Sequence, residues 1–241
     1  MVLKLISATP SPYARKVRIA LAEKSIPFEL VTEVPWDSTT QTPQYNPLEK
    51  LPVLIDTEAG KDSEDEGEAV YESHFILDWI EYKFAPPRYV SLTPDTREGE
   101  LFAKKVQVIA DGMCDACVLM FFEKQRSSPS PDWTARQRRK VDGGLKQLAA
   151  WVAEAEAEAD KEKANAKANE NREEEFFLVN NKFTLADIAA GCVLGYLRVR
   201  FAEHPWQEEY PHLKRYSDRL EARESFKDTV PTPQTISDRI V

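Results

Sequence analysis

A proline directly before a buried apolar run is the feature that most constrains this chain. Residues 53–55 are Val, Leu and Ile, enough for a buried strand, and Pro52 stands immediately before them. Proline has no N–H to give a sheet ladder, so it belongs at the first residue of a strand or at a bend. A cis Leu51-Pro52 bond, a form that about 5–6% of such bonds adopt, would leave the main chain of Val53 unpaired. We therefore expect Val53 to offer its N–H and C=O to an extended peptide.

A second junction follows about twenty residues later. The apolar run at residues 69–71 ends in Glu72 and Ser73, where a helical pattern opens. A carboxylate, a hydroxyl and the N–H groups of a helix N-terminus can together hold the amine and the carboxylate of an amino acid. The sequence therefore predicts two adjacent sites, one for an extended backbone and one for an amino-acid head group.

The first third of the chain predicts an α/β domain. Strands are expected at residues 3–7, 28–32, 53–56 and 68–71, with helices after Pro12 and over residues 73–84. Ser11 is a typical N-cap and Pro12 a typical first helical residue. The right-handed crossover of the first strand–helix–strand unit makes its strands parallel. The expected order is βαβ-ββα, with an acidic loop between the last two strands.

The rest of the chain is predicted to be helical. Helices are expected at residues 98–124, 133–153, 185–200 and 211–223. Thr184 and Asp187 form a capping-box pattern, and the helix that they begin is apolar on most sides, so it belongs in the middle of its domain. An acidic insert at about residues 154–175 has no apolar stripe. It predicts an exposed helical extension or a flexible segment, and no site.

Charge and residue usage exclude several classes of partner. The 41 acidic and 32 basic residues give a net charge of −9, which argues against nucleic acid and anionic membranes. No apolar run approaches the about 18 residues that span a bilayer. No secretory signal pattern is present, so we expect a cytoplasmic protein. Three histidines without ligand spacing predict no metal site.

Four motifs, in order, carry a resemblance to a known family. They are the run from Ser11 to Ala20, the run from Asn46 to Leu54, the Glu72-Ser73 pair, and the capping box. With the domain order, they make the chain similar to the cytosolic glutathione transferases, as a serine-type, tau- or theta-like bacterial or fungal member. The resemblance implies a thioredoxin-like glutathione-binding domain at residues 1–84, a linker at 85–95 and an all-helical domain at 96–241.

The resemblance implies an enzyme of detoxification. It would conjugate the thiolate of glutathione, its co-substrate, to small hydrophobic electrophiles, with glutathione peroxidase as a side activity. It would be a cytoplasmic homodimer. The alternative is a non-catalytic module of the same fold, with a binding or regulatory role. The intact motifs favour the enzyme.

The resemblance also implies how the thiol is activated. A free thiol has a pKa near 8.5, so ionising it at neutral pH needs a shift of roughly two units, about 3 kcal/mol. A hydroxyl that donates to sulfur at a helix N-terminus favours the thiolate. Ser11 is the expected catalytic residue. Thr9 and Ser7, just upstream, carry rival hydroxyls, and Tyr13 carries a phenol. Activation without any side chain is a further alternative, and the choice stays open at this point.

The remaining implied residues fall into two groups. Val53 would pair with the cysteine of glutathione, Glu72 and Ser73 would take its γ-glutamyl end, and Lys50 its glycine carboxylate. The implied glutathione-binding residues are Thr9, Tyr13, Gln41 (with Thr40), Lys50, Leu51, Pro52, Val53, Glu72, Ser73 and Asp115. The implied hydrophobic-substrate residues, between the domains, are Met113, Cys117, Met120 and Phe121, with Tyr196.

Two cysteines test a different class of chemistry. Cys114 and Cys117 form a C-x-x-C pattern, but it lies inside an unbroken helical pattern rather than at a strand-to-helix turn. Redox relatives of the family carry a cysteine where this chain has Ser11. We therefore interpret Cys114 and Cys117 as packing residues and not as a dithiol centre.

Overall fold

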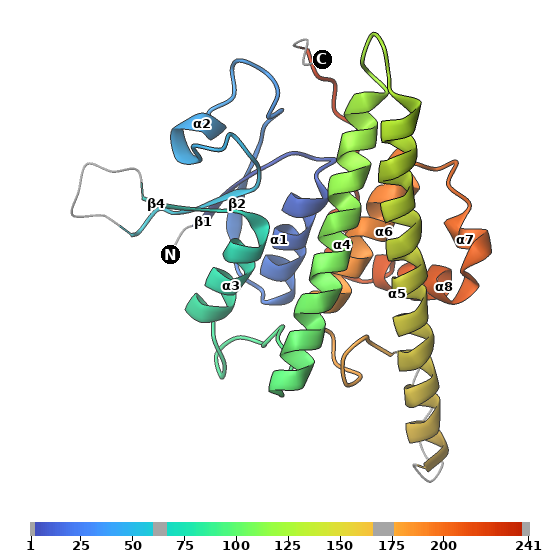
Figure 1. The fold of residues 1–241 in the computed structure, drawn as a ribbon. Coiled ribbons are helices and arrows are strands. Elements are labelled where there is room, and N and C mark those ends of the chain that lie inside the picture. The colour runs from blue at the N-terminus through green and yellow to red at the C-terminus, as the bar shows by residue number, and fades with distance from the viewer. Residues whose placement is uncertain (1–2, 60–66, 166–175, 238–241) are drawn as a thin grey trace. The chain divides into compact units, whose positions relative to one another are not determined.

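The computed structural model describes residues 3–59, 67–165 and 176–237, which form two compact units (Figure 1). Unit 1 combines Met1–Ser91 with the C-terminal segment Ser225–Ile240, and unit 2 is Leu92–Glu224. The sequence expectation put all of residues 96–241 in the helical domain, so the structure differs for the C-terminal segment. The physical reason is Phe226, which is buried in unit 1 with its ring centroid 5.2 Å from the guanidinium carbon of Arg15.

Unit 1 is built on a four-stranded sheet in the order β2-β1-β3-β4. The strands are β1 (Leu3–Ser7), β2 (Phe28–Thr32), β3 (Val53–Asp56) and β4 (Glu68–Tyr71). β1 runs parallel to β2 and antiparallel to β3, and β3 runs antiparallel to β4. This mixed sheet confirms the predicted thioredoxin-like βαβ-ββα domain.

Helices cover both faces of this sheet. Helices α1 (Pro12–Glu23) and α3 (Ser73–Lys83) contact each other and bury Leu5, Leu54 and their neighbours on one face (Figure 1). On the other face, Ile6 and Val53 pack near Tyr45 of the short helix α2 (Thr42–Tyr45). The sequence of residues 34–46 shows no period and predicts an irregular segment, because four helical residues are too few to reveal one.

The charged residues of α1 are more buried than the spacing of its apolar residues predicts. The stripe through Tyr13, Val17 and Leu21 would leave Arg15 and Lys16 outside it, yet each of these two is 1% exposed. Arg15 is held by the C-terminal segment, since Nη2 donates to the carbonyl of Phe226 over 3.0 Å and Nε donates to Thr229 Oγ1 over 3.3 Å. A pattern confined to α1 cannot reveal partners that lie more than 200 positions further along the chain.

Unit 2 is helical, as predicted. Its helices are α4 (Arg97–Glu123), α5 (Pro131–Asn165), α6 (Leu185–Arg200), α7 (Trp206–Glu209) and α8 (Pro211–Glu221), and α9 (Glu224–Lys227) leads back to unit 1. Helix α4 lies beside both α5 and α6. Every residue of α6 from Leu185 to Leu197 is buried, which confirms its predicted place in the middle of this unit.

A buried carboxylate organises the start of α6. Asp187, 0% exposed, accepts hydrogen bonds from the N–H of Leu178 (3.0 Å), the N–H of Thr184 (2.9 Å) and the hydroxyl of Tyr216 (2.7 Å). The side chain of Thr184 caps the helix in return, so the predicted capping box is confirmed. Burial raises the pKa of Asp187, and the hydrogen bonds oppose this rise. One side chain thus joins α6, α8 and the chain before α6.

Removing this carboxylate tests its importance for stability. We expect Asp187→Ala to lower the free energy of unfolding by about 3–5 kcal/mol, because three buried donors lose their acceptor. Tyr216→Phe, the matched control, removes a single hydrogen bond and should cost about 1 kcal/mol. Urea denaturation followed by circular dichroism measures both. Equal losses for the two variants would contradict this role of Asp187.

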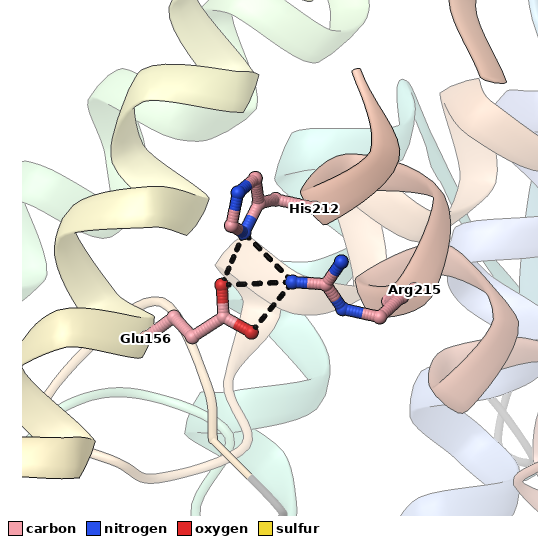
Figure 2. A network of polar contacts seen from close by, with 3 residues as sticks. All are labelled: Glu156, His212 and Arg215. Carbon is pink, nitrogen blue, oxygen red and sulfur yellow. Dashed lines mark hydrogen bonds and ion pairs between the residues drawn. The ribbon is translucent and has the colours of Figure 1, made fainter. Parts of the chain in front are cut away.

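The acidic insert is partly helical. Of the two alternatives predicted for residues 154–175, the helical extension holds for residues 154–165, because α5 continues to Asn165. Residues 166–175 lie outside the described residues. Figure 2 shows how the early part is tethered to α8: Glu156 meets His212 Nδ1 at 2.5 Å and Arg215 Nη2 at 3.1 Å. Partial burial alone would raise the pKa of Glu156, but bonds from His212 and Arg215 bring it below its ordinary value of 4.5.

This tether should depend on pH. A carboxylate whose pKa is lower in the folded state stabilises that state above its unfolded pKa and loses the effect as pH falls through the folded pKa. Glu156→Gln should therefore destabilise unit 2 at about pH 6, by less than about 1 kcal/mol for a solvent-accessible pair. The difference from the unchanged protein should be smaller at about pH 3, because the stabilisation is lost as the pH falls through the lowered folded-state pKa. Urea titrations at both pH values measure it, with Glu154→Gln on the exposed side of α5 as control. A difference that does not change with pH would contradict the tether.

Candidate glutathione site at the end of the sheet

Strand pairing gathers four chain segments at one end of the sheet in unit 1. Val53 lies opposite Ile6 of β1 and opposite Tyr71 of β4, and Ser7 lies opposite Thr32 of β2. Because β1 and β2 are parallel and β3 is antiparallel to β1, three strands end where β3 begins. The residues after β1, β2 and β4 and those before β3 therefore leave the sheet together. These segments carry the residues of unit 1 that the sequence predicted for glutathione.

The approach to β3 matches one expectation and corrects another. The Leu51-Pro52 bond is cis, as predicted. Val53, however, is 0% exposed and is flanked by β1 on one side and β4 on the other. Its N–H and C=O therefore face a paired strand and not solvent. The prediction of an unpaired Val53 is thus wrong. The half-buried Leu51 lies just outside the ladder, two residues before the start of β3.

Asn46 fixes the segment that leads to Leu51. Its side chain is 2% exposed, its Nδ2 donates to the carbonyl of Lys50 over 2.8 Å, and its Oδ1 accepts from the N–H of Leu48 over 2.9 Å. The carbonyl just before Leu51 is therefore already satisfied. The ammonium of Lys50 is exposed and forms no ion pair with the described residues. It is a cation available to an anion at this end of the sheet.

Glu72 and Ser73 form the junction between β4 and α3. Glu72 has a φ of +74°, a region that costs a residue other than glycine of order 1–3 kcal/mol. This conformation turns its carboxylate over the helix end, where it accepts from the N–H groups of His74 (3.1 Å) and Phe75 (3.2 Å). The helix N–H groups that were expected to be open are thus occupied by Glu72. Ser73 is 3% exposed, and its hydroxyl donates to Glu72 over 3.3 Å.

The hydroxyls near the start of α1 are not equivalent. Ser11 Oγ accepts from the N–H of Ala14 over 3.2 Å, and no acceptor for its proton is found among the described residues. Thr9 Oγ1 instead donates to the carbonyl of Thr232 over 2.9 Å. Tyr13 is half-buried, with Lys16 Nζ 6.0 Å from its ring centroid. Of Ser11 and Thr9, only Ser11 keeps a proton to donate at the helix N-terminus.

Glu33, which sequence reasoning missed, organises the predicted segment around Gln41. Its carboxylate accepts from the hydroxyls of Thr40 and Thr42 and from the N–H groups of Gln41 (3.0 Å) and Thr42 (3.1 Å). Partial burial raises the pKa of Glu33, but these hydrogen bonds outweigh it and the net pKa is lowered. The Gln41 side chain projects from a segment that this one carboxylate folds. No spacing marked Glu33, because its partners come from an aperiodic stretch.

The predicted residues of unit 2 belong mostly to its core. Met113 (1% exposed), Cys117 (0%) and Met120 (4%) are buried, and a Cβ added at Gly144 of α5 would lie 2.3 Å from Met113 Sδ. Burial raises the pKa of Cys117 to about 12, so it stays a thiol, consistent with a packing residue. Asp115 is exposed on α4.

The two aromatic candidates of unit 2 differ in exposure. Phe121 is half-buried, with the guanidinium carbon of Arg200 4.4 Å from its ring centroid, and Tyr196 is 4% exposed. Burial raises the pKa of the Tyr196 phenol. The described residues contain no group of three His, Cys, Asp or Glu side chains placed to hold a metal, and no helix among them could cross a membrane.

The fold is a thioredoxin-like α/β domain followed by a helical domain. Comparison with known proteins gives the family: residues 10–83 match the glutathione S-transferase N-terminal domain, and residues 131–219 match its C-terminal domain. The chain belongs to the glutathione S-transferase family. A GST-like protein of Escherichia coli K12, YibF, itself described as uncharacterized, is 31% identical over 95% of this chain and 98% of its own length.

Two solved structures are also similar to this chain. A glutathione S-transferase of Methylobacterium radiotolerans, in complex with glutathione sulfonate, is 51% identical with a TM-score of 0.83 and full coverage of both chains. A glutathione S-transferase of Methylobacillus flagellatus with bound glutathione is 32% identical, with a TM-score of 0.78, over 95% of this chain and 100% of that one.

The role of Glu33 is testable by an isosteric change. Glu33→Gln replaces one acceptor oxygen by a donor that faces other donors, so we expect a loss of about 1 kcal/mol in unfolding free energy. Glu29→Gln, an equal charge change at an exposed position of β2, should stay within about 0.5 kcal/mol of the unchanged protein. Urea denaturation compares them. Indistinguishable variants would contradict the view that Glu33 holds residues 40–42.

Proposed function

We propose that this protein is a glutathione transferase that ionises the thiol of glutathione and adds it to hydrophobic electrophiles. Its family membership and the glutathione ligands named for two similar structures support glutathione as the co-substrate. The observation that carries the proposal is the hydroxyl of Ser11, which caps α1 as an acceptor and retains its proton. The proposed enzyme is of the serine type and is tau- or theta-like.

The tripeptide is proposed to lie along the end of the sheet. The main chain of its cysteine pairs with the main chain of Leu51. Leu51 lies before the start of β3 and takes this role in place of Val53. The exposed carboxylate of Glu72 attracts the γ-glutamyl amine, and Ser73 lies beside it. The glycine carboxylate falls near Lys50 and the segment that carries Gln41.

The chemistry at sulfur follows from this placement. A hydroxyl donor at the N-terminus of α1 stabilises a thiolate by hydrogen bonding and by the helix dipole together. Thr9 is the weaker candidate because its proton is committed to the carbonyl of Thr232. Tyr13 adjoins the same turn and would contact the ligand. The thiolate attacks the electrophilic carbon, forms a C–S bond and expels the leaving group or, with an activated alkene, yields an adduct that takes up a proton.

Further parts of the proposal concern the second substrate and the assembly. Phe121 on α4 is the best placed of the predicted electrophile residues, because it is half-buried whereas Met113, Cys117 and Met120 pack inside unit 2. A cytoplasmic homodimer in which Asp115 reaches the glutathione of the partner subunit completes the proposal, with peroxidase as a side activity. The alternative is a module that binds glutathione without turnover.

Substitution of Ser11 tests the mechanism. With a chromogenic halonitroarene as electrophile, Ser11→Ala should lose about 10- to 50-fold in kcat/KM at about pH 6.5 and less than about threefold at about pH 9. The loss shrinks because free glutathione is largely ionised at the higher pH. Ser11→Thr, which keeps a hydroxyl and a cap, should recover most of the rate. Ser7→Ala, a buried hydroxyl deletion at the end of β1, is the matched control.

The outcomes separate the two functions. A loss of less than about threefold for Ser11→Ala at the lower pH would remove Ser11 from the mechanism. Retention of the unchanged protein on immobilised glutathione without any conjugation or peroxidase activity would favour the non-catalytic module. No retention and no turnover would contradict both.

A further inference from the structure

The C-terminal segment of unit 1 follows α1 from its last turn back toward its first. Ser225 Oγ donates to Glu23 Oε1 over 2.5 Å, and Arg18 Nη2 donates to the carbonyl of Asp228 over 3.0 Å. Since α1 begins directly after Ser11, the segment runs toward the end of the sheet where the candidate site lies.

Arg15 anchors this segment. Its guanidinium, 1% exposed, donates to the carbonyl of Phe226 and to the hydroxyl of Thr229, and it lies against the ring of Phe226. Thr229 is itself 5% exposed. A buried cation is tolerated only when its donors are paired, so these contacts are required by the fold of unit 1. The anchor is complete by Thr229, before the last described residues.

Beyond the anchor, Thr232 forms a two-way clasp with Thr9. The N–H of Thr232 donates to the carbonyl of Thr9 over 3.4 Å, and Thr9 Oγ1 donates to the carbonyl of Thr232 over 2.9 Å. Pro231 and Pro233 flank Thr232 and have no N–H, so Thr232 carries the one main-chain donor of these three residues. Their fixed φ angles also reduce the entropy lost when the segment docks.

The segment continues to the connection after β2. Gln234 Nε2 donates to the carbonyl of Glu33 over 3.4 Å, and the N–H of Ser237 donates to Asp37 Oδ1 over 3.1 Å. Glu33 is the residue whose carboxylate folds the segment around Gln41. The last described residues thus contact both connections that carry predicted glutathione ligands, the turn before Ser11 and the segment before Gln41.

We infer that residues 231–237 are a positioning element of the glutathione site, in which Thr232 holds the turn that presents Ser11 and Gln234 supports Glu33. This inference rests on the proposed function. The carbonyl of Thr232 accepts the hydroxyl proton of Thr9, so Ser11 is left as the donor. Thr232 also restrains the turn in which the N–H of Ser11 donates to the carbonyl of Ala8 over 3.1 Å. Neither Thr232 nor Gln234 is required to touch the substrate.

A positioning role differs from general stabilisation in where its loss is felt. Thr232 and Pro233 are exposed, whereas Pro231 is buried and Ile236 is half-buried, so removal of residues 231–237 should lower the melting temperature modestly. A small displacement of a reacting group, however, can reduce a rate by an order of magnitude or more. The site should therefore be affected much more than the melting temperature.

Two truncated chains and one point variant of the full chain test this inference. A chain that ends at Val230 keeps the Arg15 anchor and loses the clasp, whereas a chain that ends at Ser237 keeps every contact described and is the control. Thr9→Val removes the hydroxyl half of the clasp. The measurements are melting temperature, amide hydrogen exchange at Ser11, and kcat and KM for glutathione at about pH 6.5.

For the chain ending at Val230 we expect about tenfold faster exchange at the Ser11 amide and about fivefold lower kcat/KM, chiefly through KM for glutathione. Thr9→Val should show a smaller change in the same direction, and the chain ending at Ser237 should stay within about twofold. Unchanged exchange and unchanged KM in the chain ending at Val230 would overturn the inference. A fall in kcat/KM that is accounted for by a smaller fraction of folded protein would overturn it as well.

Failure of the proposed function would look different. If the full protein neither binds nor conjugates glutathione, the exchange measurement still decides whether the segment holds the Ser11 turn. Faster exchange at Ser11 with only a modest fall in melting temperature supports the clasp, and unchanged exchange overturns it.

Discussion

The insertion of β3 between β1 and β4 is the constraint on which the rest of unit 1 depends. Because Val53 pairs with Ile6 on one side and with Tyr71 on the other, the start of β3 meets the ends of β1, β2 and β4 at one end of the sheet. A shift of one residue would turn every core side chain of β3 to the opposite face. The register that packs the core therefore also assembles the site.

The polar groups at this end of the sheet divide into those already satisfied and those that remain available. The carboxylate of Glu72 accepts hydrogen bonds from the start of α3 while it stays exposed, and Asn46 satisfies the carbonyl of Lys50. The hydroxyl proton of Ser11 and the ammonium of Lys50 have no partner among the described residues. An anionic peptide with a thiol is the kind of ligand that these two groups fit.

The sequence predicts the strands, the cis Leu51-Pro52 bond and the capping box of α6, because each depends on residues close together in the chain. It misses contacts between distant segments. The acceptors of Arg15 lie beyond residue 225, so the spacing within α1 does not reveal its burial. Val53 was expected to be unpaired because Pro52 precedes it, but β1 and β4 flank it on both sides. Glu33 and Thr232 escaped notice for the same reason, since hydrogen bonds to aperiodic segments leave no spacing to detect.

The most direct test of the account is a titration of glutathione bound to the unchanged protein, followed by the ultraviolet absorbance of its thiolate. Thiol activation at the start of α1 predicts a thiol pKa near about 6.5, roughly two units below that of a free thiol. A bound thiol that still titrates near about 8.5 would contradict thiol activation at the start of α1.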